Sequence, residues 1–245
     1  MYPRPTRTIA GSLAVAATLG AGVLALAAPG SSKPSGEAAG FAQPTFTNPG
    51  KIDNRYLPLT RRKRCELRGE AHDGTVERSI KTVLDRRKVF MVSGRRVPAI
   101  VLQDQAFEDG ELVETTLDYF AQGDNGWVYY LGEDVKNLRN GKVVNRKGTW
   151  LFGKDTDRLG VAMPAEPKLG QQWRLEDVPG VTMESNRLEE TGLRTKVGKT
   201  IREDVIRVQE FIQPEGEIEY KLYASGIGTV AEYPPDGRVS FAGCR

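Results

Sequence analysis

The sequence predicts a mainly β domain, an antiparallel meander that forms a barrel or a strongly curved sheet. From about residue 54, short runs of β-branched, aromatic and other apolar residues alternate with pairs that favour tight turns. These pairs supply the positive φ angles that hairpins require, and they are Asp73-Gly74, Asp109-Gly110, Asn125-Gly126, Asn140-Gly141 and Asp236-Gly237. Cys65 and Cys244 lie near the two ends of the same region.

The first 27 residues resemble a secretory signal peptide, for which we expect a helix. Arg4 and Arg7 precede the apolar stretch 9–28, and Ala25-Leu26-Ala27 supplies the small residues of a cleavage site. Secreted protein should then begin near Ala28. The alternative is an uncleaved membrane anchor, because twenty apolar residues can just span a bilayer. Either way, the sequence predicts a secreted or cell-envelope protein.

A change in composition predicts the domain boundaries. Residues 28–53 are rich in Pro, Ser, Gly and Ala, which is typical of a flexible, disordered linker. Residues 54–245 are then one β-rich domain. The stretch 155–167 fits no strand pattern and is interpreted as a short helix or an irregular crossing.

The two cysteines predict a disulfide, since an even pair in an exported chain is usually oxidised. Two unpaired thiols are the alternative. A Cys65–Cys244 bridge would make the first and last strands neighbours.

Hairpin registers permit an assignment of faces in the middle of the chain. With Asp109-Gly110 as a two-residue turn, Asp118 faces Val101; the next turns place Glu133 opposite Thr116 and Trp150 opposite Leu131. Because side chains alternate along a strand, one face then collects a core of Ile100, Leu102, Val113, Leu117, Tyr119, Val128, Tyr130 and Leu151. The other collects Phe120, Trp127, Tyr129, Leu131, Trp150 and Phe152, with Glu114, Asp118, Glu133 and Arg146 beyond.

The second face predicts a candidate ligand site made by Asp118, Tyr129, Glu133 and Trp150. Exposed aromatic rings would leave a large apolar patch, so we expect this face to point inward, with Glu133 hydrogen-bonded or paired with Arg146. A cavity with an aromatic floor and acidic groups can hold a small ligand. The alternative is that later strands simply fill the space.

Other motifs are missing, which narrows the function classes. The single histidine, His72, lies beside a predicted turn and suits neither a serine triad nor a zinc site. Without Arg4 and Arg7 the chain has 33 basic residues (35 minus 2) against 32 acidic ones. This near-neutral charge gives no reason to expect the basic surface that nucleic-acid binding requires. We expect no catalytic residues, no metal and no cofactor.

Five short motifs follow one another in the β-rich region: 118–122 (DYFAQ), 129–135 (YYLGEDV), 148–150 (GTW), 163–167 (MPAEP) with Gly170, and 223–230 (YASGIGTV). As a set they resemble a family of exported, mostly-β bacterial domains, common in actinobacteria, with no established activity, and the likeness covers roughly residues 54–245. Ser225 stands where the family often has Pro, and Asn54-Arg55-Tyr56-Leu57 departs from a common Asn-Pro-Tyr-Phe. The resemblance implies an exported β domain and assigns no site residues.

These observations favour a non-enzymatic module that binds a small apolar or amphipathic ligand, or an envelope partner. The alternative is a hydrolase that uses acidic residues near Glu133. Contact with a membrane is expected only through the N-terminal segment, if it is retained.

Overall fold

The computed structural model describes residues 44–60, 63–213 and 216–245, and these form β-strands and connecting loops with no helix. The strands are β1 (Arg64–Ala71), β2 (Val76–Val92), β3 (Arg95–Glu108), β4 (Glu111–Gln122), β5 (Val128–Arg139), β6 (Lys142–Asn145), β7 (Trp150–Leu151), β8 (Gly160–Met163), β9 (Gln172–Val178), β10 (Thr182–Val197), β11 (Thr200–Gln213), β12 (Glu217–Ala224), β13 (Gly228–Tyr233) and β14 (Gly237–Cys244).

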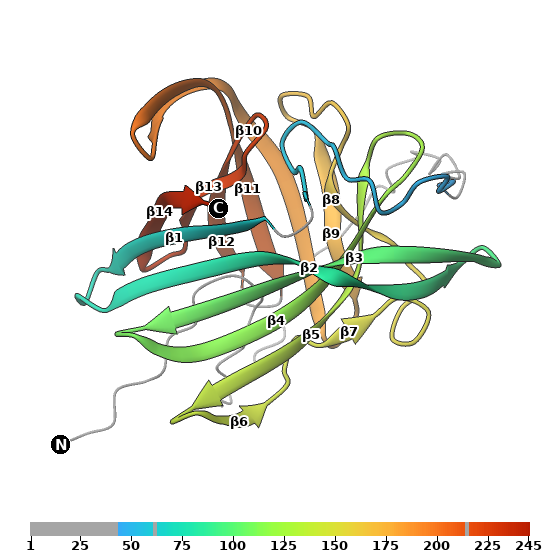
Figure 1. The fold of residues 1–245 in the computed structure, drawn as a ribbon, viewed down its shortest axis with the longest axis horizontal. Helices are drawn as coiled ribbons and strands as arrows, with labels where there is room; N and C mark the ends of the chain where they lie inside the picture. The colour runs from blue at the N-terminus through green and yellow to red at the C-terminus, as the bar shows by residue number, and fades with distance from the viewer. Residues whose placement is uncertain (1–43, 61–62, 214–215) are drawn as a thin grey trace, which may run out of the picture.

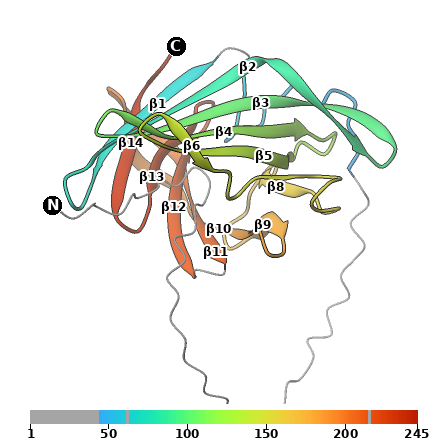
Figure 2. The same cartoon turned by 90° about the horizontal axis from the view of Figure 1, so that it is seen from below.

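All fourteen strands belong to one antiparallel meander that is strongly curved but not closed into a barrel. The strand order is β6-β5-β4-β3-β2-β1-β14-β13-β12-β11-β10-β9, with β7 and β8 also paired to β5 (Figure 1). Figure 2 shows β1 to β5 forming one wall, while β10 to β13 run across the space beneath it. The predicted antiparallel β fold is confirmed as a curved sheet.

The curvature brings the two ends of the strand order close together. A Cβ added to Gly160 in β8 would lie 2.0 Å from the carbonyl oxygen of Leu175 in β9, so only glycine allows this backbone approach. Thr156 Oγ1 donates a hydrogen bond of 3.1 Å to the carbonyl oxygen of Asp177. The two walls therefore enclose a space without a continuous ladder of backbone hydrogen bonds.

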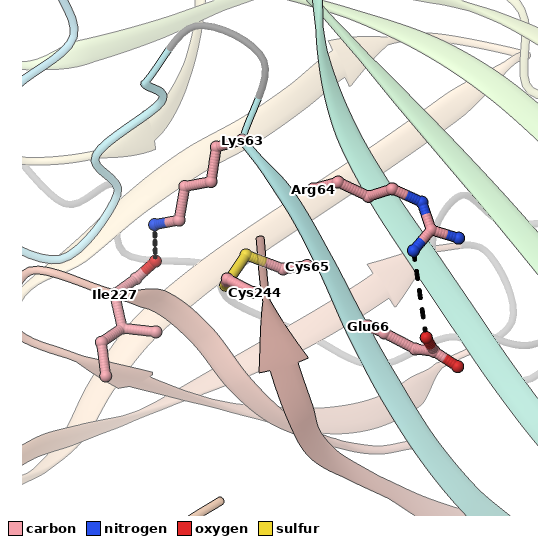
Figure 3. The surroundings of a disulfide bond; sticks show 6 residues. All are labelled: Lys63, Arg64, Cys65, Glu66, Ile227 and Cys244. Atoms are coloured by element: carbon pink, nitrogen blue, oxygen red, sulfur yellow. Dashed lines mark hydrogen bonds and ion pairs between the residues drawn. A yellow bond between two sulfur atoms is a disulfide. The ribbon is translucent and has the colours of Figure 1, made fainter.

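The predicted disulfide joins the first and last strands, as Figure 3 shows. Cys65 and Cys244 face each other across β1 and β14 with Cα atoms 4.1 Å apart. Backbone hydrogen bonds of 2.9 Å run in both directions between Arg64 and Arg245. Both the bridge and the neighbouring terminal strands are confirmed, and the disulfide is compatible with an extracytoplasmic location.

The Asp109-Gly110 turn is correctly predicted, but the register beyond it shifts by one residue. Both turn residues have positive φ, 48° and 88°, and Glu108 faces Glu111. Opposite Ala106 and Phe107 of β3, the strand β4 has one extra residue, which forms a bulge. The bulge places Asp118 opposite Leu102 instead of Val101.

A second bulge corrects the predicted register of β4 and β5. Asp118 faces Glu133 while Phe120 faces Tyr130, so Leu131 and Gly132 together oppose Tyr119. The predicted pairing of Glu133 with Thr116 is therefore wrong. Trp150 faces Glu133 instead of Leu131.

The bulges also correct the predicted sorting of side chains between the two faces. The inner face contains Phe120, Tyr130 and Trp150, together with Ile100 and Leu102. The outer face contains Val101, Tyr119, Ala121, Tyr129 and Leu131, packed with Phe90 and Val97. Both faces of this wall are thus apolar and both are covered.

The segment 44–53, assigned above to the linker, packs on the sheet. The ring of Phe46 meets that of Tyr129 edge-on, with centroids 5.6 Å apart. Thr47 donates a backbone hydrogen bond of 2.8 Å to Asp124, and Ile52 is buried. Residues 44–53 are therefore packed instead of forming a free linker, because Phe46 covers the outer face and Ile52 belongs to the inner core. The strand β8 likewise occupies part of the stretch 155–167, where no strand was expected.

The predicted signal peptide and its cleavage site lie outside the described residues. Within 44–60, 63–213 and 216–245, no helix is long and apolar enough to cross a membrane.

Removing the disulfide should destabilise the fold through the unfolded chain. The bridge closes a loop with a sequence separation of 179 residues, so the double variant Cys65→Ser, Cys244→Ser should lose ~2–4 kcal/mol of unfolding free energy. Equilibrium urea denaturation measures the loss, with reduced wild-type protein as the matched reference. Equal stability of oxidised and reduced wild-type protein would contradict the expectation.

Candidate functional site

A cavity of about 110 Å³ lies between the two walls of the curved sheet. Its lining combines apolar side chains with carboxyl groups and two lysines. The apolar lining residues used below are Leu57, Leu102, Phe120, Tyr130, Ala162, Ile212 and Tyr223. The polar ones are Lys81, Asp104, Asp118, Glu176, Glu184, Asn186, Glu210, Glu219, Lys221 and Glu232.

Three of the four predicted site residues fall in one row across the first wall. Cross-strand pairing aligns Leu102, Asp118, Glu133 and Trp150 on neighbouring strands. Asp118 lines the cavity, whereas Glu133 and Trp150 are almost fully buried beside it. The sequence predicted that these three residues share a face, although through incorrect registers.

Aromatic contacts and hydrogen bonds hold the row in place. The hydroxyl of Tyr130 donates a 2.7 Å hydrogen bond to Asp118 Oδ1. The Tyr130 ring stacks on Phe120 at 4.8 Å between centroids and meets Trp150 edge-on at 5.4 Å. These contacts leave Asp118 in a fixed orientation toward the cavity.

Tyr129 is the predicted site residue that the structure separates from the others. It lies on the outer face, where its hydroxyl accepts a 2.9 Å hydrogen bond from Asn125 Nδ2. The bulge at Leu131 and Gly132 reverses the alternation, so Tyr129 and Glu133 point to opposite sides. Arg146 is also misplaced by the prediction, since it pairs at 2.7 Å with Asp134 at the surface.

Glu176 links the predicted row to the far end of the sheet. Trp150 Nε1 donates a 2.9 Å hydrogen bond to Glu176 Oε1, and Thr182 Oγ1 donates a short one to Oε2. Glu133 also shares a hydrogen bond with Glu176. Two carboxyl groups can share a hydrogen bond only if one carries a proton.

The second wall supplies the polar side chains that sequence reasoning missed. Glu184 lies beside Glu176 on one side and Ile212 on the other. Asn186, Glu210 and Glu219 form an adjacent row across β10, β11 and β12. The alternation of Glu184, Asn186 and Leu188 along one strand could have predicted them, because it places an acidic and an amide group on the same face as an apolar residue.

Two lysines balance part of this acidity. Lys81 forms a short ion pair with Asp104 and lies 3.2 Å from Glu232, and Lys221 pairs with Glu210 at 2.6 Å. Burial alone would lower the pKa of Lys221, but Glu210 and other carboxylates raise it well above its usual value. Both lysines are therefore charged at neutral pH.

The remaining carboxyl groups are shifted toward their protonated forms. Burial raises the pKa of Asp118 to about 7 and that of Glu219 to about 8. Burial, followed by repulsion from Glu210, raises the pKa of Glu184 well above its usual value. Each shift follows from the cost of a charge in a region with little water.

Five buried acceptor atoms of cavity-lining residues have no hydrogen-bond partner among the residues that the structure describes. They are Glu184 Oε1, Asn186 Oδ1, Glu210 Oε1 and both carboxylate oxygens of Glu232. Glu232 has Lys81 3.2 Å away as an ion-pair partner, whereas Glu184, Asn186 and Glu210 lie together on the paired strands β10 and β11. Buried polar atoms are nearly always paired in native proteins, so these residues identify the polar part of the site.

Known metal arrangements do not account for the acidity. Among the described residues, no group of three or more His, Cys, Asp or Glu side chains could hold a metal ion.

No protein-family model, curated protein or solved structure matches the chain. The family resemblance drawn from the motifs therefore stays a prediction, and the site rests on its own geometry.

The buried carboxyl groups predict a pH-dependent stability. Burial raises the pKa of both Glu114 and Glu219 from 4.5 to about 8, so the folded state binds their protons more tightly than the unfolded chain does. Their stabilisation is complete below the unfolded pKa and is lost as pH rises to about 8. The unfolding free energy should therefore fall between about pH 5 and pH 8.

Glu114→Gln should flatten this fall by up to ~1.4 kcal/mol per pH unit, the limit for one titrating group. Urea denaturation across the pH range measures the slope. Glu203→Gln is the matched control, since that side chain is 74% exposed. An unchanged slope in Glu114→Gln would contradict the prediction.

Proposed function

We propose that this domain is a non-enzymatic binding module that takes a small amphipathic ligand into the cavity between its two walls, outside the cytoplasmic membrane. One observation carries the proposal: a single cavity is lined both by aromatic and aliphatic side chains and by buried polar groups with unpaired acceptors. Small-molecule sites combine these two features.

The apolar lining residues can accept a hydrocarbon group. Phe120 and Tyr130 stack against each other, and Ile212, Leu57 and Tyr223 are also part of the lining. Moving a CH₂ group from water into such surroundings stabilises by about 0.8 kcal/mol. A chain of a few carbon atoms would therefore gain enough to bind weakly on its own.

The size of the cavity limits the ligand. An engineered cavity of about 150 Å³ is known to bind benzene, so 110 Å³ accommodates on the order of five non-hydrogen atoms by the same comparison. The ligand is accordingly a small molecule, or the end of a larger envelope component.

A second candidate function is a hydrolase that uses Asp118 and Glu133. The observation that favours it is their direct cross-strand pairing, which places opposite Cβ atoms about 4.5–5.5 Å apart. Retaining glycosidases use carboxyl groups about 5–5.5 Å apart. Asp118, with its pKa raised to about 7, has the protonation that a general acid needs.

Binding should be visible with 1-butanol, whose five non-hydrogen atoms match the cavity. Titration should shift the NMR signal of the Trp150 indole N–H, because that group donates to Glu176 in the cavity wall. Ala162→Leu should abolish the shift by filling the cavity.

Leu102→Ala tests the same cavity in the opposite direction. The enlarged space should accept 1-hexanol, which wild-type protein should reject, and this variant remains informative if Ala162→Leu does not fold. Absence of a saturable shift with either alcohol in wild-type and enlarged cavities would refute the binding proposal.

The hydrolase candidate predicts turnover of aryl glycosides or aryl esters by purified protein. Asp118→Asn and Glu133→Gln should each lower kcat by at least about 100-fold, as expected for loss of general acid-base catalysis. Glu203→Gln again serves as the exposed control. Absence of turnover by wild-type protein across both substrate classes would eliminate this candidate.

A further inference from the structure

We propose that the polar end of the ligand is a protonated amine, held by Glu184, Glu210 and Asn186. This inference rests on the proposed binding function and adds the chemical class of the ligand. It concerns the second wall, whereas the candidate hydrolase would use Asp118 and Glu133 of the first.

The unpaired atoms of the cavity all require a donor. On β10 and β11, Glu184 Oε1, Asn186 Oδ1 and Glu210 Oε1 accept hydrogen bonds and have no partner among the described residues. The oxygens of Glu232 on β13 also have no hydrogen-bond partner there, but Lys81 lies 3.2 Å from that carboxylate. The side chains of Glu184, Asn186 and Glu210 are 6%, 2% and 1% exposed, so bulk water does not satisfy them fully. An ammonium group carries three N–H donors and no acceptor, which suits the three unpaired acceptors on β10 and β11.

The charge of the cavity selects a cation over an anion. Its lining includes seven acidic residues and two lysines, and each lysine already pairs with a carboxylate. Asp118 and Glu176 receive hydrogen bonds from Tyr130, Trp150 and Thr182. Among the described residues, Glu184 Oε1 has no hydrogen-bond donor, and the ion pair of the nearby Lys221 is with Glu210. A ligand with its own carboxylate would add a further buried negative charge, which is costly.

The arrangement of the strands places the amine end beside the hydrocarbon end. Asn186 and Glu210 face each other across β10 and β11, and Glu184 faces Ile212 on the same pair of strands two residues away. Tyr223 and Phe120 also line the cavity. An ammonium among these carboxyl groups would thus have its alkyl chain against apolar and aromatic side chains, which attract cations as well.

Binding of an amine should be linked to the release of protons. Glu184 faces Glu176 from β9, Glu210 from β11, and Glu219 and Lys221 from β12. Burial keeps its pKa high in the free protein, and an adjacent ammonium favours the ionised carboxylate. The ammonium form should therefore bind more tightly as pH rises from about 6 to about 8.

Three matched four-carbon probes test the inference: butylamine, 1-butanol and butyrate. We expect butylamine to bind at least tenfold more tightly than 1-butanol at pH 7.5, and butyrate more weakly than either. The readout is the shift of the Trp150 indole N–H signal in NMR titrations of the oxidised, folded domain.

Glu184→Gln should lower the affinity for butylamine at least fivefold and leave that for 1-butanol within twofold. Glu203→Gln, with an exposed side chain on β11, should change neither. If Glu184→Gln does not fold, the pH series decides with wild-type protein: the Kd of butylamine should fall at least threefold from pH 6 to pH 8, while that of 1-butanol should not fall.

The outcomes separate the two proposals. Equal binding of butylamine and 1-butanol would overturn the amine inference and leave the binding function intact. Preferential binding of butyrate would also overturn it. Failure of all three probes to bind would contradict the binding function itself.

Discussion

The hydrogen bond from Trp150 Nε1 to Glu176 Oε1 connects two parts of the sheet that backbone pairing leaves open. Trp150 belongs to β7, which pairs with β5, and Glu176 belongs to β9, the last strand in the order. The close backbone approach of Gly160 and Leu175 lies between the same two regions. A buried indole and a buried carboxyl each lose water on folding, so their pairing makes the curved conformation the one in which both are satisfied. Together with that backbone approach, this contact closes the gap that the ladder leaves beside the cavity.

The acidic interior is not explained by stability. Burying a carboxyl group costs free energy unless it is paired or protonated, and apolar residues of similar volume usually stabilise as well or better. Here Glu184 and Glu219 line the same cavity as Ile212 and Tyr223. Apolar residues in place of the two carboxyl groups would extend the apolar contacts of Ile212 and Tyr223. Local departures of this kind from a favourable core are expected at functional sites. The same carboxyl groups that reduce the stability of the fold are therefore the ones from which the ligand chemistry is inferred.

The sequence predicted the parts of this protein that depend on local chemistry. Asp109-Gly110 and Asn140-Gly141 adopt positive φ at both residues and form hairpin turns, and the disulfide pairs the terminal strands. The sequence also predicted that Asp118, Glu133 and Trp150 share one face. Registers failed because a bulge adds one residue without a distinct sequence signal, and each added residue reverses the faces beyond it. The second wall was missed because contacts such as Trp150 with Glu176 depend on curvature over the whole sheet.

Gly132 shows how one position can connect these features. Its φ is 123°, and a Cβ there would lie 2.3 Å from the carbonyl oxygen of Trp150, so another residue would strain the backbone and displace β7. The bulge it permits lets β5 present Leu131 to the outer core and Glu133 to the inner side. The outer core requires the cover supplied by residues 44–53, and the inner side positions Trp150 against Glu176. A single strand thus serves two cores, and the placement of the site follows from the backbone freedom of one glycine.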